Sequence, residues 1–129
     1  MERQAIFPPG RPNPNPPYSP GIRLGNLLFT AGQVGADATG KTPSDIRDQT
    51  RTVFENLKAV LTAGGSGLEH VLKATVYLTD IKEFAAMNEV YRSYFSGALP
   101  ARTTVAVAAL ARPELRIEIE MIAHVPGVG

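Results

Sequence analysis

The chain of 129 residues contains no cysteine and only two histidines, His70 and His124. Without cysteine it can form no disulfide, no thiolate nucleophile and no zinc site that depends on sulfur ligands. The two histidines lie far apart in sequence, which does not favour a metal cluster built on imidazole. We therefore expect no metal and no cofactor. An active site in this chain would have to use acids, amides, hydroxyls and guanidinium groups.

Long apolar runs and excess charge are also missing. No segment approaches the ~20 apolar residues of a membrane span, and no apolar segment of a signal peptide follows Met1 to Gln4. The 13 Lys and Arg against 12 Asp and Glu give a net charge of +1, which predicts neither a nucleic-acid nor a membrane partner. With 43% hydrophobic residues, the chain has the composition of one globular, cytoplasmic domain.

Proline is concentrated at the start of the chain, where seven of the 11 prolines lie between Pro8 and Pro20. Proline fixes φ and lacks an N–H donor, so this stretch predicts an extended, polyproline-like arm. The spacings Pro14 to Pro17 and Pro17 to Pro20 match a P-x-x-P ligand, but a Pro-rich tract contains such spacings unavoidably. We favour an arm along the body of the protein, and assign residues 1–17 to the arm and 18–129 to one domain.

After the arm, hydrophobic patterning predicts strands and helices. Gly25-Asn26 suits a tight turn between strands at 22–24 and 27–33. The stretch 43–63 has an apolar face at helical spacing and is followed by Gly64-Gly65, a typical helix end. Residues 71–78 alternate as a strand, and Asp80 with Glu83 predicts a capping box that opens a second helix. Further strands are expected at 103–110 and 116–125.

This order, β-β-α-β-α-β-β, predicts an α+β sandwich in which two helices cover one face of a mixed sheet. The strand at 103–110 is apolar on both of its sides, with Val105 and Val107 opposite Ala106 and Ala108. Two helices cannot cover both faces of a sheet. We therefore expect another subunit to bury the second face, so that the protein is a homo-oligomer.

Residues 35–42 match the phosphate-loop pattern G-x-x-x-x-G-K-[ST] letter for letter. A true phosphate loop continues into a helix at its Gly-Lys-Thr, whereas here Pro43 disfavours helical backbone at Thr42. Asp37 would also place a carboxylate among the phosphates. We interpret the segment as a turn.

Three polar positions remain as candidates. Asn88 lies within an apolar helical stripe, where its amide either bonds backbone, which we favour, or contacts a ligand. Arg102 shares a strand face with small residues, where its guanidinium would bind a ligand carboxylate or form a salt bridge with Glu118 or Glu120. Either glutamate could carry a proton.

A simple hairpin between the last two strands would place Glu118 opposite about Val107. Arg102 would then lie roughly 17 Å further along the ladder. A site that uses both Arg102 and Glu118 would therefore lie more naturally between subunits than within one.

Several segments together resemble the reactive intermediate deaminase family (RidA, formerly YjgF). The resemblance runs from about Tyr18 to Val125 and is carried by T-A-G-Q at 30–33, M-N-x-x-Y at 87–91, P-A-R at 100–102 and I-E-I-E at 117–120. It implies a homotrimer of chorismate-mutase-like subunits with three sites in the clefts between neighbours. It also implies hydrolysis of 2-enamines and 2-imines to 2-keto acids and ammonia, without metal or cofactor.

The resemblance also implies roles for individual residues. Arg102 matches the arginine that grips the substrate carboxylate, and Glu118 matches the acid near the attacking water. Tyr18 and Asn88 match residues that line the cleft. Two positions depart from the family: Ala31 replaces a frequent serine, which removes a hydroxyl, and Thr104 replaces a frequent cysteine, with a small effect on cleft shape. Both leave substrate choice open.

Three alternatives to 2-iminobutanoate or 2-aminoacrylate deamination stay open. The protein could deaminate a bulkier, pathway-specific unsaturated amino acid, or it could bind small carboxylates for regulation with little turnover. Some relatives are credited with ribonuclease activity, which a net charge of +1 does not favour here.

Overall fold

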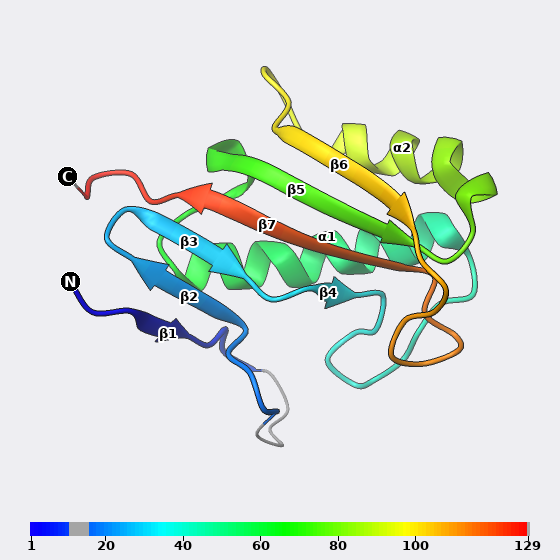
Figure 1. The fold of residues 1–129 in the computed structure, drawn as a ribbon, viewed down its shortest axis with the longest axis horizontal. Coiled ribbons are helices and arrows are strands. Elements are labelled where there is room, and N and C mark those ends of the chain that lie inside the picture. The colour runs from blue at the N-terminus through cyan, green and yellow to red at the C-terminus, as the bar shows by residue number, and fades with distance from the viewer. Residues whose placement is uncertain (11–15, 129) are drawn as a thin grey trace.

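A computed structural model describes residues 1–10 and 16–128 as one mixed sheet with two helices packed against one of its faces (Figure 1). The strands are β1 (Gln4–Ile6), β2 (Gly21–Leu24), β3 (Leu27–Thr30), β4 (Gln33–Val34), β5 (Val71–Leu78), β6 (Ala101–Ala106) and β7 (Ile117–His124). The helices are α1 (Ile46–Ala63) and α2 (Phe84–Ser93). The short 3-10 turn η1 (Leu68–His70) precedes β5, and a second one, η2 (Ile81–Glu83), precedes α2. The predicted fold class is confirmed, with β1 and β4 as additional short strands.

The strand order is β1-β2-β3-β7-β5-β6, and β4 pairs with β7 as well. All pairs are antiparallel except β5 with β6. The expected hairpin between the last two strands is therefore wrong, because β5 lies between β6 and β7. Helix α2 carries the chain back so that β6 runs parallel to β5, a βαβ unit that patterning within each strand does not reveal.

The hairpin of β2 and β3 forms as predicted around Gly25 and Asn26. Gly25 has a φ of +60°, a conformation that glycine adopts without steric cost. The expected single strand 27–33 is interrupted after Thr30, and the chain resumes pairing only at Gln33. The intervening Ala31 and Gly32 lie beside Glu118, as described below.

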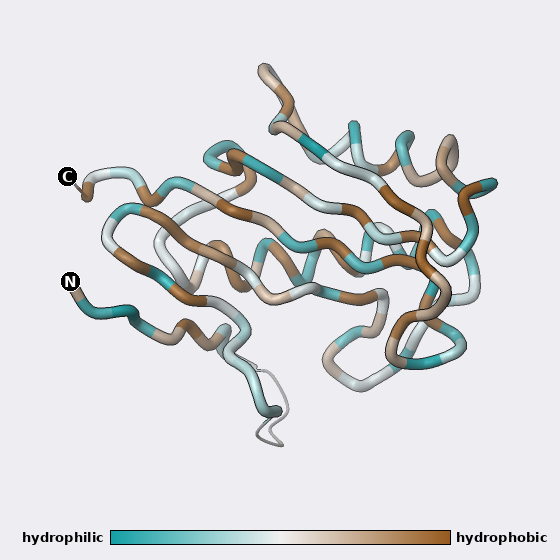
Figure 2. The backbone as a smooth tube through the Cα atoms, viewed as in Figure 1, coloured by the Kyte–Doolittle hydropathy of each residue, from teal (hydrophilic) through white to brown (hydrophobic). Residues whose placement is uncertain are grey.

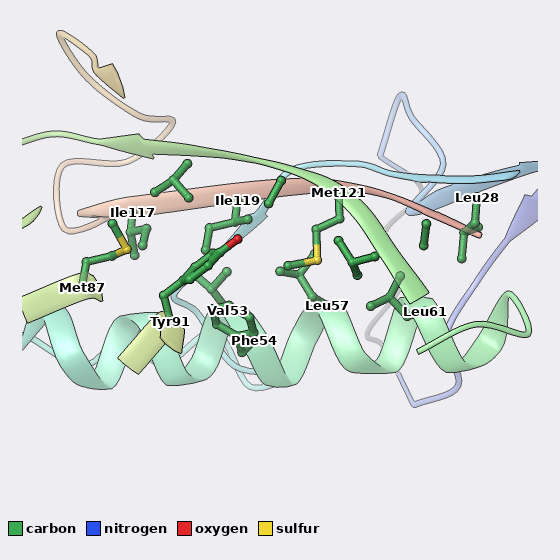
Figure 3. Packing of buried hydrophobic residues seen from close by; sticks show 14 of the residues in the cluster. Leu28, Val53, Phe54, Leu57, Leu61, Met87, Tyr91, Ile117, Ile119 and Met121 are labelled. Atoms are coloured by element: carbon green, nitrogen blue, oxygen red, sulfur yellow. The ribbon is translucent and has the colours of Figure 1, made fainter. Parts of the chain in front are cut away.

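Helix α1 buries one face against the sheet and ends at Gly64, followed by Gly65 at a φ of +85°. Figure 3 shows Val53, Leu57 and Leu61 of this helix directed at Ile119, Met121 and Leu28 of the sheet. Within the core, the ring of Phe54 stacks on Tyr94 with centroids 4.4 Å apart and meets Tyr91 edge-on. No helix among residues 1–10 and 16–128 is long and apolar enough to cross a membrane.

Helix α2 begins less regularly than the predicted capping box. The side chain of Asp80 accepts a hydrogen bond from the backbone N–H of Lys82 and opens η2, and α2 starts only at Phe84. Glu83 does not complete the box, because its carboxylate pairs with Arg116 at 3.0 Å. The long-range ion pair has replaced the local contact.

The segment that matches a phosphate loop is a turn, as predicted. Its Asp37 carboxylate accepts hydrogen bonds from the backbone N–H groups of Thr39 and Lys41, and Gly40 has a φ of +87°. Helix α1 begins only at Ile46, after Pro43. The aspartate thus occupies the donors that a phosphate would need.

The N-terminal arm contributes a strand that the sequence did not predict. Gln4–Ile6 pair with β2, and Ile6 is buried in the core. Of the prolines in the two P-x-x-P spacings, Pro14 lies outside the described residues. Edge strand β1 covers β2, while β6 forms the opposite edge of the sheet (Figure 1).

The second face of the sheet carries no helix in the described part of the chain. Apolar and polar residues alternate along its central strands, so the two faces differ in character (Figure 2). Phe29 and Val105 remain about two-fifths exposed on this face, at 40% and 39%. Large apolar side chains at such positions agree with a covering partner, and the homo-oligomer stays a prediction.

Candidate functional site

The residues predicted to form the site line two separate pockets, except Thr104, which lines neither. The first, which we call the Arg102 pocket, has a volume of about 140 Å³ and is lined by Asn88, Tyr91, Arg92, Leu99, Pro100 and Arg102. The second, the Glu118 pocket, has a volume of about 450 Å³, and its lining includes Tyr18, Ala31, Gly32, Gln33, Asn56 and Glu118. Each pocket therefore holds part of the predicted site.

Strand β6 places Arg102 on the helix-covered face, where its register partner is the buried Ala74 of β5. The half-buried guanidinium forms no ion pair or hydrogen bond with any described residue. Instead its Cζ lies 4.6 Å from the ring centroid of Tyr91 and 5.5 Å from that of Phe84. A cation removed from much of its water without a counter-ion is unfavourable unless a ligand supplies the negative charge.

Three uncharged polar atoms near this arginine are buried without a hydrogen-bond partner: Asn88 Oδ1, Tyr91 Oη and Thr104 Oγ1. The favoured interpretation of Asn88, a hydrogen bond to backbone, is therefore wrong. Buried polar atoms that lack a partner are rare and unfavourable by about 1–3 kcal/mol each. Their grouping around Arg102 and α2 makes this pocket a candidate binding site, and Tyr91 is a member to which the sequence analysis gave no role.

Glu118 lies on β7, on the face opposite the helices, and its register partner on β5 is Tyr77. Burial raises the pKa of its carboxyl, and the nearby Glu120 raises that pKa further. Glu120 itself accepts a hydrogen bond from the Tyr77 hydroxyl at 3.3 Å. A carboxyl with a raised pKa is suited to exchange protons near neutral pH.

Gly32 allows Glu118 its position, because a Cβ at Gly32 would overlap the Glu118 carboxylate. The neighbouring Ala31 donates its backbone N–H to Pro20 at 2.8 Å, which ties the segment carrying Tyr18 to the link between β3 and β4. Tyr18, Ala31 and Glu118 thus meet around one pocket, although Tyr18 is 58% exposed.

Two amides of α1 support this pocket. Asn56 donates to the backbone carbonyls of Val34 and Ala36, at 3.0 and 2.9 Å, and so fixes one wall. Buried Gln49 donates to Pro43 and Glu114 and accepts from the backbone of Arg116. Sequence patterning assigns both residues to the helix at 43–63, but only the fold shows which backbone groups they bind.

Replacing Asn56 with alanine should lower the free energy of unfolding by about 1–3 kcal/mol, because two carbonyls lose their donor. It should also raise KM for a substrate that binds in the Glu118 pocket, because the wall that Asn56 holds becomes less ordered. Urea unfolding and steady-state kinetics measure the two effects. Arg51→Ala, on the exposed side of the same helix, should change neither by more than a small amount; an equal effect of both variants would contradict the support role.

Arg102 and Glu118 do not meet within one chain, as expected, but the reason differs from the one predicted. In register, Arg102 aligns with Ala74 and Met121 on the helix face, whereas Glu118 aligns with Tyr77 and Val105 on the other face. The alternative salt bridge from Arg102 to Glu118 or Glu120 is therefore wrong within the chain. The body of the sheet separates these groups.

Candidate metal ligands do not gather in the described residues: no group of three His, Asp or Glu side chains lies close enough to hold a metal ion. His70 and His124, distant in sequence, do come together, with ring centroids 6.1 Å apart. They lie outside the lining of both pockets.

The sequence matches one protein-family model and several known relatives over most of its length. A family model described as Endoribonuclease L-PSP matches residues 9–125. A RutC family protein of Pyrococcus horikoshii is 50% identical over 124 residues, covering 95% of this chain and 98% of the relative. TdcF of Escherichia coli (strain K12), named as a candidate reactive intermediate deaminase, is 40% identical over 111 residues, covering 83% of this chain and 85% of the relative.

Solved structures share the fold. A crystal structure of Escherichia coli TdcF with bound serine superposes with a TM-score of 0.87 at 38% identity, covering 94% of this chain and 98% of that one. The structure of a candidate endoribonuclease of Thermotoga maritima gives a TM-score of 0.89 at 42% identity, covering 98% and 100%. The similarity thus extends over nearly the whole length of both chains.

Proposed function

Because the chain belongs to the Endoribonuclease L-PSP family, which includes the reactive intermediate deaminases, we propose that it hydrolyses short 2-imino and 2-enamino carboxylates. The substrates we propose are compounds such as 2-iminobutanoate and 2-aminoacrylate, and the products are 2-keto acids and ammonia. The observation that carries this proposal is the unpaired, half-buried Arg102 surrounded by polar atoms that lack partners. The bound serine in the TdcF structure, a small molecule with a carboxylate, supports it.

In this proposal the Arg102 guanidinium holds the substrate carboxylate with two parallel hydrogen bonds. An enamine first gains a proton on carbon and loses one from nitrogen to become the imine, whose carbon is electrophilic. A water molecule adds to that carbon and the electron pair of the C=N bond moves to nitrogen, which takes up a proton. The C–N bond of the resulting carbinolamine then breaks as ammonia leaves, and loss of the hydroxyl proton gives the keto acid.

Glu118 is the group we propose to handle these protons. Its raised pKa allows it to accept a proton from the attacking water and to return one to the leaving nitrogen. Orientation of the carboxylate and of the water accounts for the rest of the rate enhancement, since the imine is already reactive.

The separation of the two pockets leads us to propose that the active protein is a homotrimer. In it the Arg102 pocket of one subunit faces the Glu118 pocket of the next, so that each cleft between neighbours is a complete site. The trimer follows from the family resemblance, and the uncovered sheet face with Phe29 and Val105 supports it. A mass near three times 13.8 kDa in solution, stable on dilution, is the expected result; a persistent monomer would contradict the shared site.

The test of the activity is to generate 2-aminoacrylate or 2-iminobutanoate in the cuvette and follow release of the keto acid. We expect the protein to accelerate release well beyond the buffer rate. No acceleration would overturn the proposed deaminase. If 2-oxobutanoate still binds and binding requires Arg102, the chain is instead a binding protein for small carboxylates.

A further inference from the structure

The guanidinium of Arg102 lies against two aromatic rings of one helix, and neither ring belongs to the site predicted from the sequence. Phe84 begins α2 and Tyr91 follows two turns later on the same side, so both can face β6. We propose that these rings, which we call the aromatic cradle, are positioning residues that hold Arg102 ready for the substrate carboxylate. This inference rests on the proposed function of the Arg102 pocket.

Ring faces suit this task better than an acidic partner would. A carboxylate beside Arg102 would neutralise the guanidinium and occupy the N–H groups that a substrate needs. An aromatic face attracts the cation through its quadrupole and can stack on the guanidinium plane, which leaves the N–H donors at the plane's edge available. The absence of any ion pair to Arg102 among the described residues agrees with this arrangement.

The two rings differ in their surroundings. Tyr91 is only 4% exposed, and Figure 3 shows its ring rising from α2 toward the sheet. Phe84 is 38% exposed, so it can be replaced without opening the core. The contact of Tyr91 with Arg102 is made over its ring, and its hydroxyl has no hydrogen-bond partner.

Phe84→Leu is the decisive variant, because leucine keeps an apolar side chain but removes the ring face. Cation–π contacts at exposed sites correspond to about a two- to five-fold change in an equilibrium constant. We expect Phe84→Leu to raise Kd for 2-oxobutanoate and KM for 2-iminobutanoate by that factor, with kcat and Tm nearly unchanged. Phe84→Tyr, which keeps the face, should restore wild-type values.

A further variant separates the cradle from general packing. Ile81→Ala removes a 53% exposed apolar side chain near the start of the same helix and should leave Kd unchanged. If Phe84→Leu binds 2-oxobutanoate as the wild type does, or if Phe84→Tyr is as weak as Phe84→Leu, the cradle is overturned.

An NMR measurement without ligand makes this test independent of turnover. Ring currents should shift the Nε–H and Cδ proton signals of Arg102 upfield, and Phe84→Leu should move them back toward ordinary values. Unshifted Arg102 signals in the wild type would contradict the cradle. If the Arg102 signals are shifted but the protein does not turn over imines, the cradle is supported and the proposed deaminase activity is contradicted.

Discussion

Replacing Arg102 with alanine is expected to lower kcat/KM for 2-iminobutanoate by about 30-fold or more and to abolish measurable binding of 2-oxobutanoate. The reason is that a buried carboxylate loses both its counter-charge and its paired donors, an effect of about 2–5 kcal/mol in comparable charge pairs. In situ substrate generation and calorimetric titration of 2-oxobutanoate measure the two losses.

The fold should survive this change, because Arg102 makes no ion pair or hydrogen bond with a described residue. Tm should therefore differ little from that of the wild type. Arg102→Lys keeps the charge but not the planar fork of donors, so its activity should lie between those of the alanine variant and the wild type. Full activity of Arg102→Ala would show that the carboxylate binds elsewhere.

Replacing Glu118 with glutamine is expected to lower kcat by about 10²- to 10⁴-fold, the range typical of a lost general acid–base group. KM should change much less, because the carboxylate is held in the Arg102 pocket. A pH profile of kcat should lose the limb that reports ionisation of Glu118. Retention of that limb in Glu118→Gln would assign the proton transfer to another group.

The same variant should stabilise the protein at neutral pH. Burial raises the pKa of Glu118, so the folded state binds the proton more tightly than the unfolded chain does. As pH rises through the two pKa values, ionisation therefore works against folding, and the glutamine variant escapes this loss. Its Tm should exceed that of the wild type at pH 7, and the difference should shrink below about pH 4.3, the ordinary pKa of glutamate. A lower Tm at pH 7 would indicate a charged partner for Glu118.

Mixing the two inactive variants tests whether neighbours share each site. In a ring with a head-to-tail interface, a random mixture of Arg102→Ala and Glu118→Gln subunits should leave about a quarter of the clefts with both native side chains. Activity should then recover toward about a quarter of the wild-type value after subunits exchange. No recovery after demonstrated exchange would contradict a site shared between neighbours.

The sequence by itself determined the elements whose signals are local. Helix α1, strand β5 and the turn at Gly25 follow from hydrophobic period and backbone freedom, and each appears close to its predicted limits. The motifs also singled out Arg102 and Glu118, and each of these two side chains lines a pocket. That these two groups would not meet in one chain was correct as well.

Only the tertiary structure decided how these parts are arranged. The alternation of apolar and polar residues along a strand predicts which residues share a face of the sheet, but not which strands are neighbours. The position of β5 between β6 and β7 could therefore not be predicted from the sequence. The opposite faces of Arg102 and Glu118 follow from that register. The contacts of Phe84 and Tyr91 with Arg102 depend on the same crossover, because α2 packs beside β6 only once β5 and β6 run parallel. Pairings between distant segments belong to the packed fold, and no local pattern carries them.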